Sequence, residues 1–535
     1  MALSSGYDAL VIGAGFTGLY SVFKLREIGL NVKGIEAGTG VGGTWYWNRY
    51  PGARTDSQSY VYQYFFSDEL LEEWDWSERF PAQEETENYL NFVAEKFDLK
   101  SHFEFGQRIS EARFDGNSKN WNLLSTDGKT FSGRFLVMGS GGLTVPKNPE
   151  VDGIEDFRGE LAHTSRWPRS GLQIKDKKVG IIGTGATGIQ VIQSIGKDVK
   201  ELTVFQRTPN YTIPIRNPKY DDKKREGLRV RYPTIKKARH QTFAGFSFDF
   251  EETPFHDLSK KERLAMMEKY WADGSLSFWI GLFPEMFFEE KANLEISQFV
   301  IERIRKRIHD PSVAEKLIPK NHGFGTRRVP LENNYYEVFN QPNVALVDVN
   351  KDPILKVNQN GILTSEKEYQ LDTLILATGF DAGTGALTTI DLYGRNNRLL
   401  RQEWNEKGIS TFLGLQAHGY PNMFMVMAPM SPGAAFCNVP TCIEQNVNWI
   451  TDCIQYVLNS GAQSIEPSLE AENNWVSHHD EVARETLVSK VDSWYTCANV
   501  PGKPRRVLPY CGGANNYRKH CDTVRKEGFK ECILV

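Results

Sequence analysis

Two glycine-rich segments of this sequence carry the residue types and spacing that bind dinucleotide phosphates. They read Gly13-Ala14-Gly15-Phe16-Thr17-Gly18 and Gly183-Thr184-Gly185-Ala186-Thr187-Gly188. In such a turn the glycines allow a tight bend, close approach of the backbone to a pyrophosphate, and close packing of helix on strand. The following helix N-terminus adds unpaired N–H groups and a positive dipole end. A chain with two such sites is predicted to hold two redox cofactors and to move a hydride between them.

The elements around the first turn support a nucleotide site. Residues Tyr7–Ile12 are predicted to form a buried strand, Thr17–Ile28 a helix and Asn31–Glu36 a second strand. Glu36 follows the turn by roughly 20 residues, where an acid accepts hydrogen bonds from ribose hydroxyls. A glycine-rich turn that binds nothing is the alternative, and the combination of strand, helix and acid argues against it.

The second turn also lies between a predicted strand and a predicted helix, but the strand that follows ends in different residues. Lys178–Ile182 and Glu201–Phe205 are predicted strands, with a helix over Ala186–Gly196 between them. The second strand leads into Gln206-Arg207-Thr208, without an acid. Since an acid suits a free 2′-hydroxyl and an arginine suits a 2′-phosphate, the first site is predicted to bind FAD and the second NADPH. An ordinary surface role for Arg207 is the alternative.

Composition sets limits on the function. The chain has 535 residues, 63 Lys plus Arg, 67 Asp plus Glu and a net charge of −4, which favours neither nucleic acid nor an anionic membrane surface as a partner. No apolar run is long enough to span a bilayer. Because the sequence leads directly into the first predicted strand, no signal peptide is expected.

The cysteines and histidines point to no metal or redox centre. All seven cysteines lie between Cys437 and Cys532, without a C-x-x-C pair, and the ten histidines are scattered. This pattern predicts reduced thiols in a cytoplasmic protein without a metal site. It also argues against a dithiol flavoprotein reductase, which needs a redox-active cysteine pair near the flavin.

Further elements can be placed along the chain. We expect a helix over Glu84–Phe97, a hairpin over Asn120–Leu136 with its turn at Asp127-Gly128, a linker over Pro146–Arg169, and a buried strand over Leu371–Thr378.

The segment Lys219–His322 has the charged, helical pattern of an inserted helical region. It is rich in aromatic residues, namely Phe243, Phe246, Phe248, Phe250, Phe278, Trp279, Phe283, Phe287 and Phe288. These side chains are predicted to form a core, and a lid over an apolar substrate is the alternative.

A twelve-residue motif lies just before the second glycine-rich turn. Residues 157–168 match F-x-G-x-x-x-H-x-x-x-W-P, with fixed positions Phe157, Gly159, His163, Trp167 and Pro168. Here the chain resembles the type I Baeyer–Villiger monooxygenases, flavoenzymes that insert oxygen beside a ketone carbonyl. Related flavin monooxygenases that oxidise nitrogen or sulfur carry another residue where Trp167 stands. In that family the histidine is thought to steer domain motion, and a linker histidine bonded to the backbone is the simpler interpretation of His163.

The resemblance covers nearly the whole chain and implies two cofactor sites. Residues 42–56 resemble the flavin-contacting loop of the family. The positions that the resemblance assigns to FAD are Gly13, Gly15, Phe16, Thr17, Gly18, Glu36, Thr44, Trp45, Tyr46, Trp47, Asp56, Tyr62, Ile109 and Val439. Those that it assigns to NADPH are Arg54, Thr55, Asp56, Gly183, Thr184, Gly185, Ala186, Thr187, Gly188, Gln190, Arg207, Thr208, Arg327, Arg328 and Trp494.

The resemblance also implies two catalytic residues. Thr326-Arg327-Arg328 is similar to the segment that brings the active-site arginine, which would be Arg328, and Asp56 would support it. The family usually has Lys where Arg327 stands; both are cationic, so contact with a 2′-phosphate should survive with altered geometry. An ordinary salt bridge between Arg328 and Asp56 is the alternative. Trp494 would close over the nicotinamide cofactor.

Two further segments bear on the resemblance. Ala377–Asp381 is similar to the second linker of the family. Residues 429–438, in contrast, differ in length and content from the family loop that borders the substrate site, which leaves the substrate range open.

These expectations combine into one enzyme. NADPH would reduce FAD, O₂ would add to the reduced flavin as a C4a-peroxyflavin, and this species would convert a small apolar ketone to an ester or lactone. A fixed guanidinium would stabilise the anionic peroxide and the adduct formed from it. The alternatives are a flavin monooxygenase that oxidises nitrogen or sulfur, and a non-catalytic flavoprotein sensor. The native ketone, the regio- and enantioselectivity and the oligomeric state stay open, and a monomer is compatible with the sequence.

The expected fold is α/β, with two Rossmann-like dinucleotide-binding domains and a helical insertion. The flavin domain would be discontinuous. Its division would be 1–145 for FAD, 146–217 for NADPH, 218–324 for the helical insertion, 325–384 for NADPH and 385–535 for FAD.

Overall fold

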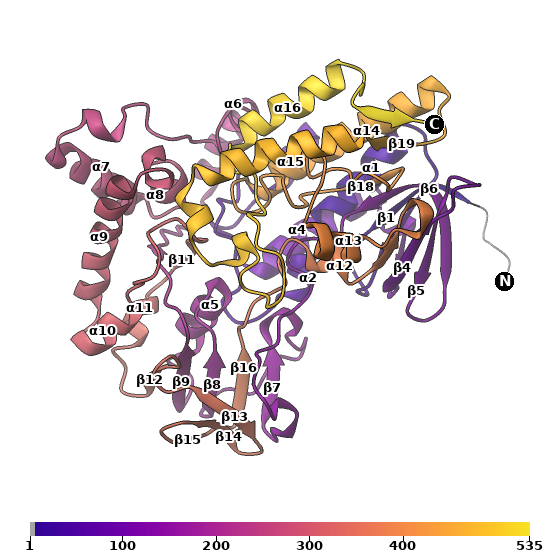
Figure 1. The fold of residues 1–535 in the computed structure, drawn as a ribbon. Coiled ribbons are helices and arrows are strands. Elements are labelled where there is room, and N and C mark those ends of the chain that lie inside the picture. The colour runs from indigo at the N-terminus through magenta and orange to yellow at the C-terminus, as the bar shows by residue number, and fades with distance from the viewer. Residues whose placement is uncertain (1–5) are drawn as a thin grey trace.

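A computed structural model describes residues 6–535 of the chain. Figure 1 shows two separate large sheets, the first mixed and the second parallel, with a group of helices beside the second sheet and long C-terminal helices packed over the first. The chain builds the first sheet, enters the second, passes through the inserted helices and then returns to the second sheet and finally to the first. The structure therefore has the expected α/β class with two nucleotide-binding folds and a helical insertion.

The first sheet is centred on β1 (Tyr7–Ile12), which pairs in parallel with β2 (Val32–Glu36) and with β6 (Thr130–Met138). Its strand order is β17-β4-β5-β6-β1-β2-β3, with β18 also paired to β6. The remaining strands are β3 (Phe103–Phe105), β4 (Ile109–Phe114), β5 (Trp121–Ser125), β17 (Asp391–Tyr393) and β18 (Met423–Met425). The predicted hairpin is confirmed as the antiparallel pair β5–β6.

The second sheet has the order β12-β9-β8-β16-β7, and all of its pairings are parallel. Its strands are β7 (Glu160–His163), β8 (Lys178–Ile182), β9 (Glu201–Gln206), β12 (Val344–Asp348) and β16 (Thr373–Leu376). Treating all of 146–169 as linker was wrong, because β7 lies within it. This edge strand has four residues and an exposed start, so it shows neither a long apolar run nor a clear alternation.

In each sheet a central strand is followed by the glycine-rich turn, and the turn is followed by a helix. Helix α1 (Phe16–Glu27) follows β1, and α5 (Ala186–Ile195) follows β8. Both predicted helices are confirmed to within a residue at each end. Helix α1 is buried over most of its length and packs against α14 (Val439–Ser460).

The inserted region is helical, as expected. Its helices are α6 (Asp222–Ala238), α7 (Lys260–Asp273), α8 (Ser277–Ile280), α9 (Glu290–Arg307) and α10 (Pro311–Leu317). Most of its aromatic side chains form a core, with Phe278, Trp279 and Phe283 fully buried, whereas Phe288 is exposed.

The C-terminal part adds α15 (Leu469–Arg484) and α16 (Ala514–Lys526) beside α14 (Figure 1). Within residues 6–535, no helix combines enough length with enough apolar character to cross a membrane. The other elements are α2 (Thr44–Trp47), α3 (Asp68–Glu73), α4 (Gln83–Lys96), β10 (Ile213–Pro214), β11 (Leu331–Glu332), α11 (Tyr335–Val338), β13 (Ile354–Asn358), β14 (Gly361–Thr364), β15 (Glu368–Gln370), α12 (Gly385–Thr388), α13 (Leu400–Lys407), β19 (Ile465–Pro467) and β20 (Cys532–Leu534).

Candidate active site

The first glycine-rich turn is closed tightly around its own backbone. A Cβ atom on Gly18 would lie 1.7 Å from the carbonyl oxygen of Gly13, so only glycine fits there. Glu36, at the end of β2, accepts hydrogen bonds from the N–H groups of Ala14 (2.7 Å) and Gly38 (2.6 Å). Burial raises the pKa of Glu36, and the two hydrogen bonds, which lower it, offset this only in part. Because each carboxylate oxygen can accept a second hydrogen bond, Glu36 still suits a ribose hydroxyl.

Short helix α2 lies against the first turn and carries three adjacent aromatic side chains. Trp45 Nε1 donates to the hydroxyl of Tyr62 at 3.2 Å, and Tyr46 hydrogen-bonds Thr39 through its own hydroxyl. The guanidinium of Arg166 lies 4.6 Å from the centre of the Trp47 ring. Two other predicted flavin positions, Ile109 and Val439, stand at the start of β4 and of α14 respectively.

The second turn is closed on one side and open on the other. A Cβ atom on Gly188 would lie 2.2 Å from the carbonyl oxygen of Gly183, whereas one on Gly185 would meet nothing within 4 Å. The open face at Gly185 adjoins the N-terminus of α5, where a pyrophosphate has room to approach. Thr184 Oγ1 donates to the carbonyl oxygen of Thr208 at 2.9 Å and so ties the turn to the end of β9.

Two neighbouring arginines, Arg207 at the end of β9 and Arg327, form no ion pair with a carboxylate among the described residues. Arg327 is largely enclosed, and its Nε–H has no hydrogen-bond partner among the described residues. Burial lowers the pKa of Arg327, and the positive charge of Arg207 lowers it further. Two neighbouring cations with an unused donor need an anion, so these residues fit the 2′-phosphate of NADPH.

Arg328 and Asp56 form an ion pair, with Arg328 Nη2 3.3 Å from Asp56 Oδ2. The other carboxylate oxygen accepts from the N–H of Leu331 at 3.1 Å. Arg328 Nη1 donates to the carbonyl oxygen of Ala434 at 3.1 Å. Burial raises the pKa of Asp56, and the charge of Arg328 opposes this shift. The guanidinium is thus fixed at two of its nitrogen atoms.

The segment that carries Trp494 lies close to the ion pair. Trp494 is half-buried and packs edge-to-face on Tyr495, with ring centres 4.3 Å apart. Tyr495 is fully buried, and its hydroxyl has no partner among the described residues. Farther along, Asn499 Nδ2 donates to the carbonyl oxygen of Phe380 at 2.8 Å, so this segment is tied to the predicted second linker.

Gln190, in α5 after the second turn, contacts residues 42–56, the predicted flavin-contacting loop. Its Nε2 donates to the carbonyl oxygen of Arg54 at 3.1 Å, and its Oε1 accepts from the hydroxyl of Tyr50 at 2.9 Å. The guanidinium of Arg54 lies elsewhere, paired with Glu78 at 3.2 Å. Thr55 is buried and accepts from the N–H of Ser57 through its hydroxyl oxygen.

The twelve-residue motif contains β7 and contacts the second linker through His163. His163 Nδ1 accepts from the N–H of Ser165 at 3.1 Å, and its Nε2 lies 3.3 Å from Thr378 Oγ1. A Cβ atom on Gly159 would lie 2.3 Å from the carbonyl oxygen of Asp372. Trp167 is buried. These contacts tie His163 to Thr378 of the predicted second linker.

Comparison with known proteins identifies the family. A model of the flavin-binding monooxygenase-like family matches residues 8–217. Acetone monooxygenase (methyl acetate-forming) of Gordonia sp. (strain TY-5) is 47% identical over 528 residues, which cover 98% of this chain and 99% of that protein. A Baeyer–Villiger monooxygenase of Pseudooceanicola batsensis is 41% identical over 534 residues, covering 99% of this chain and 97% of its own.

The chain belongs to the Baeyer–Villiger monooxygenases. Its fold is also similar to the crystal structure of OTEMO in complex with FAD and NADP, with a TM-score of 0.96, 40% identity and coverage of 99% of this chain and 100% of that one. The expected family, fold class and flavin monooxygenase activity are therefore confirmed.

Residues 429–438 of this Baeyer–Villiger monooxygenase contribute one cysteine to a disulfide. Cys437 is bonded to Cys442, with Cα atoms 6.3 Å apart, while the remaining five cysteines are free. The expectation that all seven thiols are reduced was wrong for this pair. The sequence spacing gave no sign of it, because the two sulfur atoms meet only where the chain turns into the first residues of α14.

Three contacts at the site carried no sequence signal of their own. The carbonyl of Ala434 belongs to the backbone, which any residue could supply. Tyr495 was assigned no role from the sequence, and Trp279 was expected only as one of many aromatic residues of the insertion. Within residues 6–535, no three His, Cys, Asp or Glu side chains gather where they could hold a metal ion.

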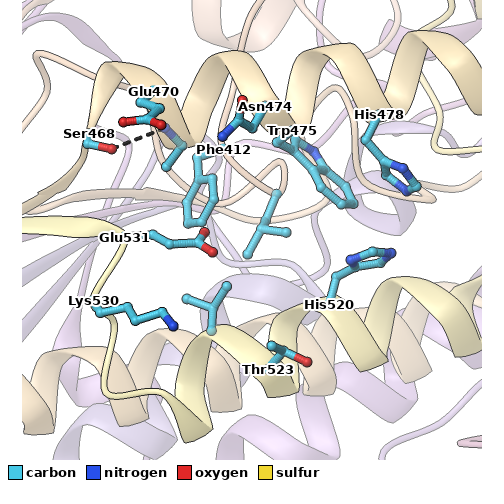
Figure 2. Close-up of a pocket in the computed structure, with 13 residues that line it drawn as sticks. Phe412, Ser468, Glu470, Asn474, Trp475, His478, His520, Thr523, Lys530 and Glu531 are labelled. Carbon is cyan, nitrogen blue, oxygen red and sulfur yellow. Dashed lines mark hydrogen bonds between the residues drawn. The ribbon is translucent and has the colours of Figure 1, made fainter.

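A groove of about 570 Å³ lies outside this site, between α15 and α16 (Figure 2). Trp475, His478 and His520 line one end, and Lys530 and Glu531 come from the C-terminal segment. None of the predicted cofactor or catalytic residues lines it. We assign the groove no part in the reaction.

Proposed function

We propose that this protein uses FAD, NADPH and O₂ to convert a ketone to an ester or lactone. The observation that carries this proposal is the Arg328–Asp56 ion pair, in which a guanidinium is fixed between a carboxylate and a backbone carbonyl. Relatives that act on ketones, such as the acetone monooxygenase, support the substrate class.

The cofactors occupy the two glycine-rich regions in this proposal. The FAD site comprises the first turn with Glu36, the α2 aromatic residues, Asp56, Tyr62, Ile109 and Val439. The NADPH site comprises the second turn, Gln190, Thr208, Arg207 and Arg327 for the 2′-phosphate, and Trp494, with Thr55 and the backbone of Arg54 nearby. FAD supplies the electron-transfer and oxygen chemistry that amino-acid side chains lack.

Arg328 serves as the electrostatic catalyst. Oxygen insertion beside a carbonyl builds negative charge on oxygen atoms, and a guanidinium that keeps its proton at working pH stabilises that charge. Asp56 orients Arg328 through the 3.3 Å contact, and Ala434 fixes the other terminal nitrogen. Because the guanidinium is already positioned, little reorganisation is needed as the reaction proceeds.

The segments around Trp494 and residues 429–438 keep water from the reacting atoms. Phe436 packs against Tyr495 with ring centres 5.9 Å apart, and Tyr495 packs against Trp494. This aromatic wall lies beside the Arg328 site. A water-poor environment strengthens the electrostatic effect of the arginine and limits loss of activated oxygen as H₂O₂.

We also propose the division 1–145, 146–217, 218–324, 325–384 and 385–535 for the FAD, NADPH, helical, NADPH and FAD parts.

A cytoplasmic location is a proposal that the five free cysteines support and the Cys437–Cys442 disulfide does not. The oligomeric state stays open, and size-exclusion chromatography with light scattering would determine it.

The proposal is tested with purified, FAD-loaded protein, NADPH and a panel of acyclic, cyclic and aryl ketones. Ester or lactone that forms in proportion to NADPH consumed supports it. Oxidation of amines or sulfides without any ester would favour a nitrogen- or sulfur-oxidising monooxygenase. Tight FAD binding without turnover of any of these compounds would favour a non-catalytic sensor.

A further inference from the structure

Trp279 lies directly against the turn that precedes Arg328. It stands in α8, is fully buried, and donates from Nε1 to the carbonyl oxygen of Gly325 at 3.1 Å. Gly325 has a φ angle of +79°, and a Cβ atom there would lie 2.7 Å from Trp279 Nε1. The indole therefore packs so closely on this turn that only glycine fits at position 325.

The face of the same indole interacts with the guanidinium itself. Arg328 Cζ lies 5.5 Å from the ring centre of Trp279, within the roughly 6 Å over which cation–π attraction acts. The in-plane N–H groups of the guanidinium are used by Asp56 and Ala434. A planar guanidinium can make edge contacts and a face contact at once. Asp56 and Ala434 bind its edge, so the indole restricts its movement out of that plane.

Trp279 also packs against two further aromatic rings. Its ring centre lies 6.3 Å from that of Phe436 and 6.5 Å from that of Phe287. Phe436 belongs to residues 429–438, the same segment whose Ala434 carbonyl accepts from Arg328. This segment therefore reaches the guanidinium both directly and through the Trp279 ring.

We propose that Trp279 is a positioning residue for Arg328, fixing the guanidinium through its π face and the preceding turn through its N–H group. The inference rests on the proposed function, because it concerns the arginine that stabilises charge during oxygen insertion. The simpler interpretation, in which Trp279 only fills the core of the insertion, makes different predictions.

Two substitutions separate these interpretations. We expect Trp279→Leu to lower kcat for ester formation about 10- to 100-fold, since displacement of a catalytic group by about an ångström has effects of this size. Trp279→Phe keeps an aromatic face and should restore kcat to within about fivefold of wild type. The rate of anaerobic FAD reduction by NADPH should stay within about threefold of wild type in both variants.

A second tryptophan of the same insertion provides the control. Trp271 has Arg303 over its ring, with Cζ 5.7 Å from the ring centre, and packs on Phe278 and Phe299. Trp271→Leu removes a similar contact whose cation is Arg303 and not Arg328, so it should leave kcat within about threefold of wild type. An equal loss of kcat in Trp271→Leu and Trp279→Leu would overturn the proposal.

A double-mutant cycle tests the link to Arg328. In an Arg328→Lys background, Trp279→Leu should lower the remaining kcat by less than about threefold, because the planar cation that the indole orients is gone. The same fold-loss in both backgrounds would show a merely structural role and contradict the proposal.

Site-specific fluorotryptophans at position 279 cover the case in which Trp279→Leu does not fold. Fluorine withdraws charge from the ring face with little change of shape, so kcat should fall stepwise from one to three fluorine atoms, whereas a constant kcat would refute the positioning role. Failure of the proposed function is distinct, since wild-type protein would then reduce FAD yet form no ester.

Discussion

The guanidinium of Arg328 and the carboxylate of Asp56 meet at 3.3 Å although 272 residues separate them in the sequence. Arg328 follows the helical insertion, and Asp56 follows the first glycine-rich region. Their contact therefore joins three parts of the chain, since Ala434 accepts from the same guanidinium. The arginine can hold its position only when all of these parts are folded together.

The buried carboxylate of Asp56 makes activity depend on pH. Burial raises its pKa above the ordinary value of about 3.9, so Asp56 is protonated at a higher pH than a free aspartate. Protonation removes the charge that orients Arg328. The kcat/KM ratio of wild type to Asp56→Asn should therefore be greatest near neutral pH and decline as the pH falls, since Asn does not titrate. Profiles of rate against pH with a ketone substrate, measured down to pH 4, test this expectation. A ratio that stays constant over the whole range would contradict this role.

The same shift predicts how Asp56 affects stability. Between the ordinary and the raised pKa the folded state binds more protons than the unfolded state, so ionisation of Asp56 lowers the free energy of unfolding as the pH rises through this window. Asp56→Asn should consequently melt no lower than wild type at pH 7 in a thermal scan, despite its lower activity. A clear fall in Tm would show that the ionised pair stabilises the fold.

Arg207 and Arg327 should determine the preference for NADPH. We expect either Arg→Ala variant to lower kcat/KM for NADPH about 10- to 100-fold, the size of one lost charge-assisted hydrogen bond, and to leave kcat/KM for NADH nearly unchanged. Arg231→Ala, at an exposed position of α6, is the matched control. An equal fall for both cofactors would mean that the two arginines do not recognise the 2′-phosphate.

Two glycines of the second turn should respond differently to alanine. Gly185 has open space where a methyl group would stand, so Gly185→Ala should keep the wild-type Tm yet weaken NADP⁺ binding about tenfold or more by obstructing the pyrophosphate. Gly188→Ala places a methyl group 2.2 Å from a carbonyl oxygen and should lower stability by about 1–3 kcal/mol or more. Melting curves and isothermal titration measure both effects. Wild-type NADP⁺ affinity in Gly185→Ala would argue against the assigned site.

The cysteine pair predicts a thiol count. In denaturant without reductant, Ellman's reagent should detect the five free cysteines, and after reduction it should detect all seven in the sequence. Cys437→Ser with Cys442→Ser should give five in both conditions. Seven reactive thiols before reduction would show that the Cys437–Cys442 bond does not form in the purified protein.

Local elements of the fold were predictable because their signals are local. Strands β1 and β8, the helices after them and the hairpin β5–β6 each depend on a short apolar pattern and on glycines at fixed offsets. Strand β7 escaped prediction because its pairing with β16, with Leu161 opposite Leu374, is set by residues more than 200 positions away along the chain.

The site was predictable only in part. The nucleotide turns and Arg207 followed from residue types, whereas the pairing of Arg328 with Asp56 was expected from family resemblance alone, since no spacing in the sequence indicates it. The Ala434 carbonyl is a backbone group and has no side-chain signature. The closeness of Trp279 to Arg328 depends on how the insertion folds back on the nucleotide domains, which no local pattern encodes.

The central claim is that this protein inserts one oxygen atom of O₂ into a ketone with the help of Arg328. The most direct measurement supplies ¹⁸O₂ and NADPH to FAD-loaded wild type and Arg328→Ala with a ketone, and follows the ester by mass spectrometry. We predict one ¹⁸O atom per ester in wild type, and a fall in the rate of ester formation of about 10²–10³ or more in Arg328→Ala. Ester without ¹⁸O, or NADPH consumed only to H₂O₂ by wild type, would contradict the account.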